Sequence, residues 1–385
     1  MFGRRIEKLA TPSPIRIRSH LCVRVRYPRA SCRLCQSICP SKSVEIEGEQ
    51  VKLNESCSGC RACVTACPAG VFELPHRLQM EGHDRIRQAL QSDPVVRFTC
   101  LRDPESDQED VFAVPCLAGL SQGELIAPLA WGADKVEVKR PSCNVCDMKE
   151  ARRQYDCTLQ GVHALLACFR ISPGPLEEVE TFSEPRFPAA ESSRSAHGGL
   201  DRREFFSLMR RRGVNRVLEA MPDPETTSET DRWGHRENGQ RSFLLGLLPL
   251  LGVPAESTLS TRVIPAGDLM VASHCVGCNI CETLCPTGAI RRDVDETGRI
   301  ALYFTAARCT GCGVCAEACP PGAIAYGEDV NLKELMGGQE RLLIHVASRP
   351  CRVCHEAFSG LPGSICPACI SARRNGMGGA VQDGR

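Results

Sequence analysis

The chain has 385 residues, a formal net charge of +1 and 26 cysteines, whereas aromatic residues make up only 5%. This length predicts two or three domains, and the scarcity of aromatic side chains argues against one large aromatic core. The near-zero net charge argues against a protein that coats nucleic acid and against an acidic-tail protein. With 33 glycines and 26 prolines, the composition favours several small, loop-rich modules.

So many cysteines indicate either a disulfide framework or a set of metal sites. The N-terminal segment, residues 1–25, is basic but has no apolar stretch of the signal-peptide kind, which favours a reducing compartment and metal thiolates. The longest apolar stretch, residues 243–253, contains Pro249 and is shorter than the roughly 18–20 residues of a membrane span. We therefore expect a cytoplasmic protein with no direct membrane span.

The spacing C-x2-C-x2-C-x3-C, followed by proline, occurs three times, and an incomplete copy without its first cysteine precedes them. Two copies lie near the start of the chain and two near its end. In chain order, the cysteines are Cys32, Cys35 and Cys39; Cys57, Cys60, Cys63 and Cys67; Cys275, Cys278, Cys281 and Cys285; and Cys309, Cys312, Cys315 and Cys319. Hairpin-like stretches separate the copies within each pair, at 44–53 and 291–304, so each pair predicts a small βαββαβ unit.

At these residues each pair resembles a bacterial-type ferredoxin with two [4Fe–4S] clusters. Three cysteines spaced by two residues wrap one corner of a cubane, and the cysteine before proline ligates the other cluster of the pair. A zinc site is the alternative, because a C-x2-C pair also suits tetrahedral zinc. The repetition of the longer run, each time with its proline, favours iron–sulfur clusters.

This resemblance implies the ligand sets. One cluster would be held by Cys275, Cys278, Cys281 and Cys319, its neighbour by Cys309, Cys312, Cys315 and Cys285, and a third by Cys57, Cys60, Cys63 and Cys39.

The fourth set departs from the pattern, because Arg29 stands where its first cysteine is expected. Cys22 lies upstream, and we expect residues 22–27 to form a strand and residues 28–31 a loop that returns to the site. Cys22, Cys32, Cys35 and Cys67 would then hold the fourth [4Fe–4S] cluster. A three-thiolate [3Fe–4S] cluster, or no cluster, is the alternative.

The middle of the chain alternates between expected strands (95–100, 111–119 and 135–143) and expected helices (77–93, 120–133 and 147–168). This alternation predicts a parallel sheet, and ligands of such sheets gather beyond the carboxyl ends of the strands. Cys100, Cys116, Cys143 and Cys146 all fall at that end, so we expect them to form one site.

Residues 95–171 resemble the iron–sulfur domain of the delta subunit of methyl-viologen-reducing hydrogenase, through FTC (98–100), PCLAG (115–119), WGADKVEVK (131–139) and CNVC (143–146). The resemblance implies one further iron–sulfur cluster, [2Fe–2S] in type, that relays electrons to a partner. Zinc or purely structural thiols are the alternatives. Cys157 and Cys168 share one face of the following helix, and we expect ordinary buried thiols, although either could substitute as a ligand.

Residues 172–199 are rich in proline, serine and glutamate and predict a linker, as do the polar residues 222–240. Between them, residues 201–221 predict an amphipathic helix pair. Its arginines favour a solvated helix face over a nucleic-acid site.

The tail carries Cys351, Cys354, Cys366 and Cys369 with the spacing C-x2-C-x11-C-x2-C. Two such knuckles are typical of a zinc ribbon, in which four thiolates hold together a piece too small to fold by hydrophobic burial. Zinc is favoured, with a rubredoxin-type iron as the alternative. His274 and His355 adjoin cysteines but are expected to be exposed bystanders.

These predictions describe a multidomain protein of mixed α+β and α/β class, with two ferredoxin-like 2[4Fe–4S] modules around a small α/β domain and a C-terminal zinc ribbon. The expected domains are residues 1–76, 77–171, 172–262 (linker with a helical segment), 263–330 and 331–385. The sequence contains no phosphate-binding glycine motif after a strand and no separate catalytic constellation.

We therefore expect a non-catalytic electron-transfer subunit that relays electrons to or from a larger oxidoreductase of hydrogenase or heterodisulfide-reductase type. Its cofactors would be four [4Fe–4S] clusters, one [2Fe–2S] cluster and one zinc ion, and its partners redox proteins rather than nucleic acid. The alternatives are a catalytic subunit with a site-differentiated cluster and a maturation or scaffold protein.

Overall fold

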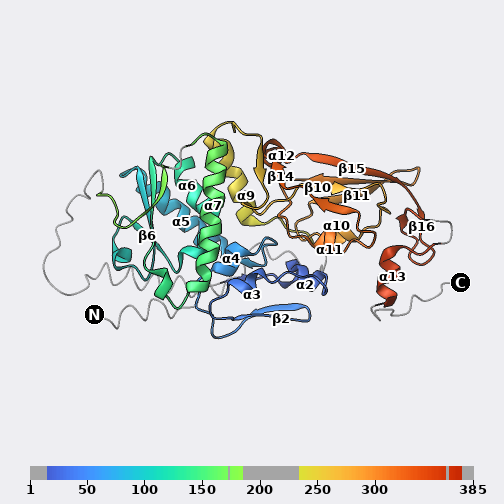
Figure 1. Cartoon of the computed structure of the whole chain (residues 1–385), viewed down its shortest axis with the longest axis horizontal. Helices are drawn as coiled ribbons and strands as arrows, with labels where there is room; N and C mark the ends of the chain where they lie inside the picture. Colours follow the sequence, from blue (N-terminus) through green and yellow to red (C-terminus); the bar gives the residue numbers. More distant parts are fainter. Residues whose placement is uncertain (1–14, 172–173, 185–233, 361–363, 375–385) are drawn as a thin grey trace.

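The computed structural model describes residues 15–171, 174–184, 234–360 and 364–374. The α/β domain lies at one end of the molecule and the C-terminal four-cysteine segment at the other, with the two modules of the cysteine runs between them (Figure 1). The helix pair expected over 201–221, and the linker residues 185–199 and 222–233, lie outside the described residues.

The N-terminal module has the expected βαββαβ order. Its elements are β1 (Arg16–Ile17), α3 (Leu34–Ile38), β2 (Val44–Glu47), β3 (Gln50–Leu53), α4 (Ala62–Ala66) and β4 (Phe72–Glu73). The outer strands β1 and β4 pair antiparallel, and β2 and β3 form the hairpin between the two helices. Each half of the module therefore supplies one short helix that lies within a cysteine run, just before the last cysteine.

Residues 22–27 do not form the expected strand. They follow a 3₁₀ turn, η1 (Ser19–Leu21), and form the helical turn α2 (Val23–Arg26). The carbonyl oxygen of Cys22 accepts from the N–H groups of Val25 (3.0 Å) and Arg26 (2.9 Å). The alternating valines suggested a strand, but both are buried here, and no neighbouring strand offers a hydrogen-bonding edge to this segment in the described structure. Packing has overridden strand propensity.

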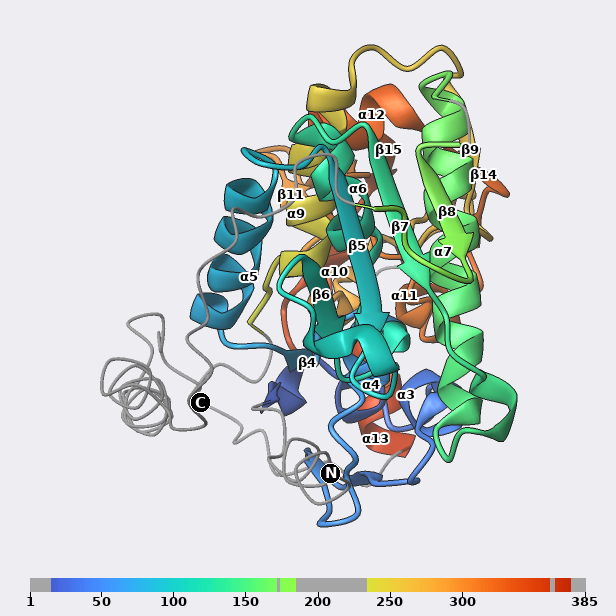
Figure 2. The ribbon, with the colours of Figure 1, turned by 90° about the vertical axis from the view of Figure 1, so that its left-hand side faces the viewer.

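The α/β domain contains the predicted parallel sheet. Its strands are β5 (Val95–Cys100), β6 (Val111–Val114), β7 (Lys135–Lys139) and β8 (Leu176–Val179), in the order β6-β5-β7-β8, and all three pairings are parallel. The helices α5 (His76–Ala89), α6 (Gln122–Ala130) and α7 (Arg152–Cys168) surround it (Figure 2). Short 3₁₀ turns connect these elements: η2 (Pro104–Asp107), η3 (Leu117–Gly119), η4 (Cys143–Val145) and η5 (Lys149–Ala151).

The fourth strand, β8, falls within residues 172–199, for which composition predicts only a linker. Leu176 is 1% exposed and pairs with Val136 of β7. Farther along, the N–H of Ser183 donates to Glu137 (2.9 Å), and its carbonyl oxygen accepts from Arg97 (3.1 Å). The strand lies at the sheet edge, where polar side chains such as Glu178 face solvent. Its polar composition therefore did not indicate a strand in the sequence.

The C-terminal module repeats the βαββαβ order. Its elements are β10 (Leu269–Val271), α10 (Ile280–Leu284), β11 (Ile290–Val294), β12 (Arg299–Thr305), α11 (Val314–Glu317) and β13 (Ile324–Tyr326), with β10 and β13 antiparallel. Elements on either side extend it: α9 (Gly239–Leu247), η6 (Leu248–Leu251) and β9 (Thr258–Ser260) before, and β14 (Asp329–Asn331), α12 (Leu332–Gly337) and β15 (Glu340–Ala347) after. Strand β15 pairs with β12, so residues 340–347 continue the sheet of this module. The tail consists of β16 (Arg349–Pro350), β17 (Ala357–Phe358) and α13 (Pro367–Arg374).

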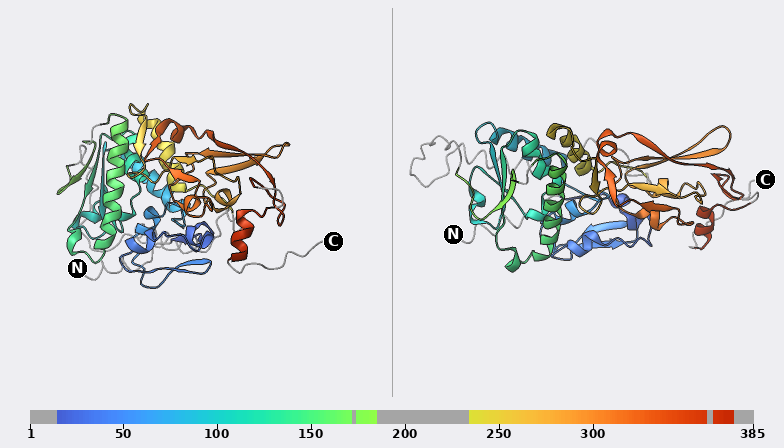
Figure 3. Two further views of the ribbon diagram at one scale, coloured as in Figure 1. Left: turned by 45° about the vertical axis from the view of Figure 1, so that its right-hand side comes forward. Right: turned by 45° about the horizontal axis from the view of Figure 1, so that its top comes forward.

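The two modules of the cysteine runs pack directly against one another, as two further views show (Figure 3). Leu284 of α10 and Val314 of α11 belong to the same hydrophobic cluster as Val23 and Val25 of α2. At the edge of this contact, the N–H and the hydroxyl of Ser31 donate to Glu317 (2.9 and 2.6 Å). The two halves of the chain therefore form one continuous body at this contact.

A buried arginine holds the α/β domain together. Arg97 of β5 is 1% exposed, and its guanidinium pairs with Asp93 (2.7 Å) and lies 3.8 Å from the equally buried Glu137. Replacing Arg97 with Met would leave the carboxylate of Asp93 without its cation, whereas Glu137 would keep Lys135 (3.0 Å). We expect the free energy of unfolding to fall by about 3–5 kcal/mol. The measurement is urea denaturation followed by far-UV circular dichroism.

The control is Arg262→Gln, because Arg262 and its partner Glu328 have side chains that are 79% and 83% exposed. An exposed pair of this kind contributes little, so the urea midpoint should hardly change. Equal midpoints for the two variants would contradict the role given to Arg97.

Candidate iron–sulfur and metal sites

Cys22 lies in the site that lacks its expected first cysteine. It is 8% exposed, and it lines one cavity together with Cys32, Cys35 and Cys67. Burial, followed by the charges of Cys67, Cys22 and Cys32, raises the pKa of the Cys35 thiol to about 12. The helical turn α2, rather than a strand, thus brings Cys22 to this group.

The second group of the N-terminal module contains Cys39, Cys57, Cys60 and Cys63. Burial raises the pKa of Cys63 above its usual range, and the charges of Cys60, Cys57 and Cys39 raise it further. The charge of Cys35, from the first group, acts on Cys63 as well, so the two groups are neighbours.

The C-terminal module contains two equivalent groups. Cys275, Cys278, Cys281 and Cys319 line one cavity together with Leu302 and Ile324. The other group joins Cys285 to Cys309, Cys312 and Cys315, and burial, followed by these charges, raises the pKa of Cys309 to about 12. Each group draws its fourth cysteine from the other run, which is the crossing that the ferredoxin resemblance implies.

The cysteine before each proline accepts the same backbone hydrogen bond in all four copies. The N–H four residues later donates to its Sγ: Ser43 to Cys39, Ala289 to Cys285 and Ala323 to Cys319, each at 3.3 Å, and Val71 to Cys67. The residue just before each donor has positive φ: Lys42, Gly70, Gly288 and Gly322. This turn directs a backbone N–H toward the sulfur. The incomplete copy has the same turn, although Lys42 stands there in place of the glycine of the other copies.

A second left-handed turn occurs only in the complete copies. Gly59, Gly277 and Gly311 have φ between 62° and 67° and stand just before the second cysteine of each run. In the incomplete copy Ser31 occupies this position and has no positive φ. The absence of the first cysteine is therefore accompanied by the absence of this turn, and Cys22, just before α2, lines the cavity of this group instead.

The four cysteines of the α/β domain gather at the carboxyl ends of the strands. Cys100 ends β5, Cys116 follows β6, and Cys143 and Cys146 follow β7. The charges of Cys143 and Cys146 act on Cys100, whose pKa burial raises. Burial also raises the pKa of Cys116 to about 12. The structure thus brings together the four cysteines that the sheet topology predicted.

This group adjoins the N-terminal module. The charge of Cys60 acts on Cys116 more strongly than that of Cys100 or Cys143. The hydroxyl of Thr65 donates to the carbonyl oxygen of Ala118 (2.7 Å), and a Cβ on Gly119 would lie only 3.1 Å from the carbonyl oxygen of Cys60. Glycine in the PCLAG segment therefore permits the close approach, and this contact between two motifs could not be predicted from either one.

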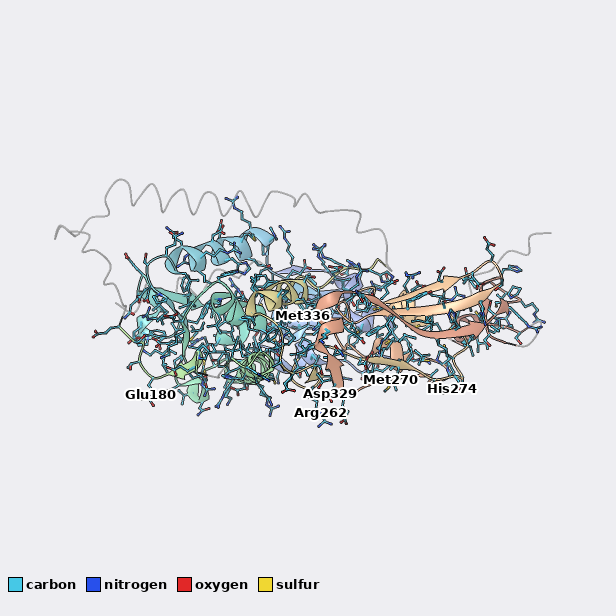
Figure 4. All side chains as sticks on the ribbon, turned by 90° about the horizontal axis from the view of Figure 1, so that it is seen from above. Glu180, Arg262, Met270, His274, Asp329 and Met336 are labelled. Carbon is cyan, nitrogen blue, oxygen red and sulfur yellow. The ribbon has the colours of Figure 1, made fainter. Side chains whose placement is uncertain are left out.

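Cys157 and Cys168 stand apart from these groups. Cys168 is buried, with its Sγ 3.9 Å from the carbonyl oxygen of Thr258, whereas Cys157 is exposed. The expectation that both are buried is wrong for Cys157, because the outer side of α7 faces solvent there. His274 and His355 are exposed, and His274 lies toward the opposite end of the molecule from Glu180 of the α/β domain (Figure 4).

The four tail cysteines form a compact group. The sulfurs of Cys351, Cys354, Cys366 and Cys369 all lie within 4.8 Å of one another. Burial raises the pKa of Cys351, but backbone hydrogen bonds from Cys354, Cys366 and Val353 outweigh it and lower that pKa to about 6. Four thiolates at this spacing suit a tetrahedral metal ion.

Family comparisons cover the complete cysteine runs at 57–67, 275–285 and 309–319. Residues 274–323 match the 4Fe–4S dicluster domain, and residues 51–73 match the 4Fe–4S binding domain. The chain is an iron–sulfur protein. Its matched domains are of the electron-transfer kind, and a four-cysteine metal site lies at its C-terminal end. No curated protein and no solved structure matches the chain at a significant level. Within the described residues, no helix is long and apolar enough to cross a membrane.

Replacing Cys22 with Ala tests its place in the first group. If Cys22 is the fourth ligand, this variant should lose between one iron atom and a whole [4Fe–4S] cluster, because the iron left without its thiolate is held less firmly than the other three. Iron and acid-labile sulfide are measured on anaerobically purified protein. Cys157→Ala is the control, since Cys157 is an exposed cysteine of α7 that belongs to none of these four-cysteine groups. Equal iron contents for C22A and C157A would exclude Cys22 as a ligand.

The tail group should release its metal on acidification. The pKa of Cys351 is depressed, so its thiolate persists above about pH 6 and takes up a proton as the pH falls through that value. Zinc affinity should therefore drop steeply between pH 7 and pH 5, as measured by transfer to a coloured chelator. Cys366→Ala should lower the zinc content by one equivalent already at pH 7. Zinc retained in C366A would place the metal elsewhere.

Proposed function

We propose that this protein carries electrons between redox partners through a series of five iron–sulfur centres. The observation that carries the proposal is that the segments bearing one cysteine group contact the segments bearing the next, from the α/β domain to the C-terminal module. Clusters held by these groups would supply one-electron redox capacity. The polypeptide would position them, bury them and leave each within short reach of the next.

The series begins at the α/β domain. Cys116 adjoins Cys60, which supports transfer between the α/β group and the group of Cys39, Cys57, Cys60 and Cys63. The influence of the Cys35 charge on Cys63 supports the next step, within the N-terminal module. Four thiols at the α/β group fit the [2Fe–2S] cluster that the hydrogenase resemblance implies.

Arg26 supports the step between modules. It follows Cys22 in α2 and is 4% exposed, and its Nη1 donates to the carbonyl oxygens of Thr283 (3.1 Å) and Cys285 (3.2 Å). One side chain thus joins the helix of one cysteine group to the backbone of a cysteine in the next. The charge of Cys315 acts on Cys281, which supports the last step, within the C-terminal module.

The partner would be a larger oxidoreductase of hydrogenase or heterodisulfide-reductase type. This part of the proposal depends on the resemblance of residues 95–171 to the hydrogenase delta subunit. A catalytic role would need an iron without a thiolate, and the position of Cys22 beside Cys32, Cys35 and Cys67 supports four thiolates instead.

The test is metal and sulfide analysis of the full chain purified without oxygen, together with EPR spectra of the reduced protein. The proposal expects about 18 iron atoms and about one zinc per chain, with clusters that reduce and reoxidise reversibly. Zinc in most of the cysteine groups would favour a scaffold instead. A substrate-dependent change in the EPR signal of the reduced protein would favour a catalytic subunit.

A further inference from the structure

Two polar side chains from outside the cysteine runs approach one group of the C-terminal module, whereas the cation near the other group faces a carboxylate. They are Arg241 of α9 and Tyr326, the last residue of β13. We propose that Arg241 and Tyr326 make the centre at Cys285, Cys309, Cys312 and Cys315 more easily reduced than its neighbour at Cys275, Cys278, Cys281 and Cys319. This inference rests on the proposed function, because it requires both centres to be iron–sulfur clusters.

The guanidinium of Arg241 is held beside Cys309. It is 5% exposed, its Nε donates to the carbonyl oxygen of Ala307 (3.2 Å), and its Nη1 donates to that of Pro265 (3.0 Å). Ala307 lies two residues before Cys309. Pro265 lies two residues before Gly267, where an added Cβ would be 3.1 Å from the Sγ of Cys309. The two carbonyls thus fix the cation between the segments that enclose this sulfur.

The charge of Arg241 has no carboxylate partner within the part of the chain that the structure describes, and its buried Nη2 makes no hydrogen bond there. Burial lowers the pKa of Arg241 to about 10, which still leaves the guanidinium protonated at neutral pH, and the charge of Cys309 stabilises that form. An unpaired buried cation is costly unless a nearby anion compensates it. A thiolate-ligated centre is such an anion, and the cation stabilises it most in its more negative, reduced state.

Tyr326 contacts the same group through its hydroxyl, which lies 2.9 Å from the Sγ of Cys315. A metal-bound thiolate carries no proton, so the phenol is the donor. Hydrogen bonds to cluster sulfurs are among the factors that set reduction potentials, and they favour the reduced state. Tyr326 stands seven residues after Cys319, and the residue seven after Cys67 in the N-terminal module is Leu74. The hydroxyl is therefore not a general property of these runs.

The neighbouring group also has a cation close to it, Arg292, but this cation faces the carboxylate of Glu356. Arg292 donates through Nε to the carbonyl oxygen of Gly277 (2.8 Å) and through Nη2 to that of Ala357, and its Nη1 faces Glu356 at 4.0 Å. The sulfurs of this group accept backbone N–H bonds, at Cys275 (3.4 Å) and Cys319 (3.3 Å). Unlike Arg241, Arg292 is thus partly neutralised by a carboxylate.

The test is an EPR-monitored redox titration of the full chain, comparing Arg241→Gln and Tyr326→Phe with the unmodified protein. The couple of interest is the one that Cys309→Ala removes. We expect R241Q to lower the ratio of reduced to oxidised centre at a fixed potential at least tenfold, which corresponds to about 59 mV for a one-electron couple. Y326F should shift the same couple in the same direction by a smaller factor, with iron and sulfide contents unchanged.

Two controls separate charge from packing. Arg241→Lys keeps the cation and should retain most of the original potential. Arg308→Gln removes a cation next to Cys309 in sequence, but its side chain is 49% exposed and paired with Glu237 (3.2 Å), so the couple should move less than twofold. An equal shift in R308Q and R241Q would overturn the specific role of Arg241.

The inference and the proposed function fail in different ways. An unmodified protein without iron would overturn the proposed function. If the R241Q and Y326F variants keep their full iron content and the reduction potential of this centre is unchanged, only the inference is overturned. If R241Q loses its iron, the Y326F variant decides the question, because this substitution removes only one hydroxyl. An unchanged reduction potential of this centre in Y326F overturns the inference. A lowered reduction potential supports it.

Discussion

The burial of cysteine sulfurs in shared groups is the constraint on which the rest of this structure depends. Burial and the charges of neighbouring cysteines raise the pKa values of Cys35 and Cys309 to about 12. Such thiols ionise at neutral pH only when a cation compensates the charge, and a metal centre does so while tying the sulfurs together. The cysteines are also part of the core, since Cys63, Cys281 and Cys315 are all at most 7% exposed. Folding and metal binding are therefore coupled.

Backbone geometry prepares each group for its metal. Left-handed residues before the amide donors turn one N–H toward a sulfur in every copy, and these bonds stabilise thiolate charge without a charged side chain. Charged side chains enter at only a few positions. Arg26 joins the two modules, and Arg241 lies beside a single group, so the environments of otherwise repeated sites differ.

The contacts between modules depend on small features. Gly119 allows the α/β domain to approach Cys60, and Ser31 ties the incomplete run to Glu317 of the C-terminal module. Asn238, just before α9, donates to the carbonyl oxygen of Pro68 (2.9 Å), so the segment after the undescribed residues also joins the two modules. The order of the cysteine groups in space follows from these contacts rather than from their order along the chain.

The sequence by itself determined the elements that follow from local spacing. The cysteine runs and their prolines carry the ferredoxin resemblance that implies the crossed groups of the C-terminal module, and the strand–helix alternation predicted a parallel sheet with Cys100, Cys116, Cys143 and Cys146 at one edge. Only the tertiary structure decided that Cys22 reaches its group through a helical turn, that Leu176 begins a fourth strand, and that Cys116 adjoins Cys60. Spacing along the chain reflects geometry within one turn or strand, whereas these contacts join segments whose proximity depends on how separate surfaces pack.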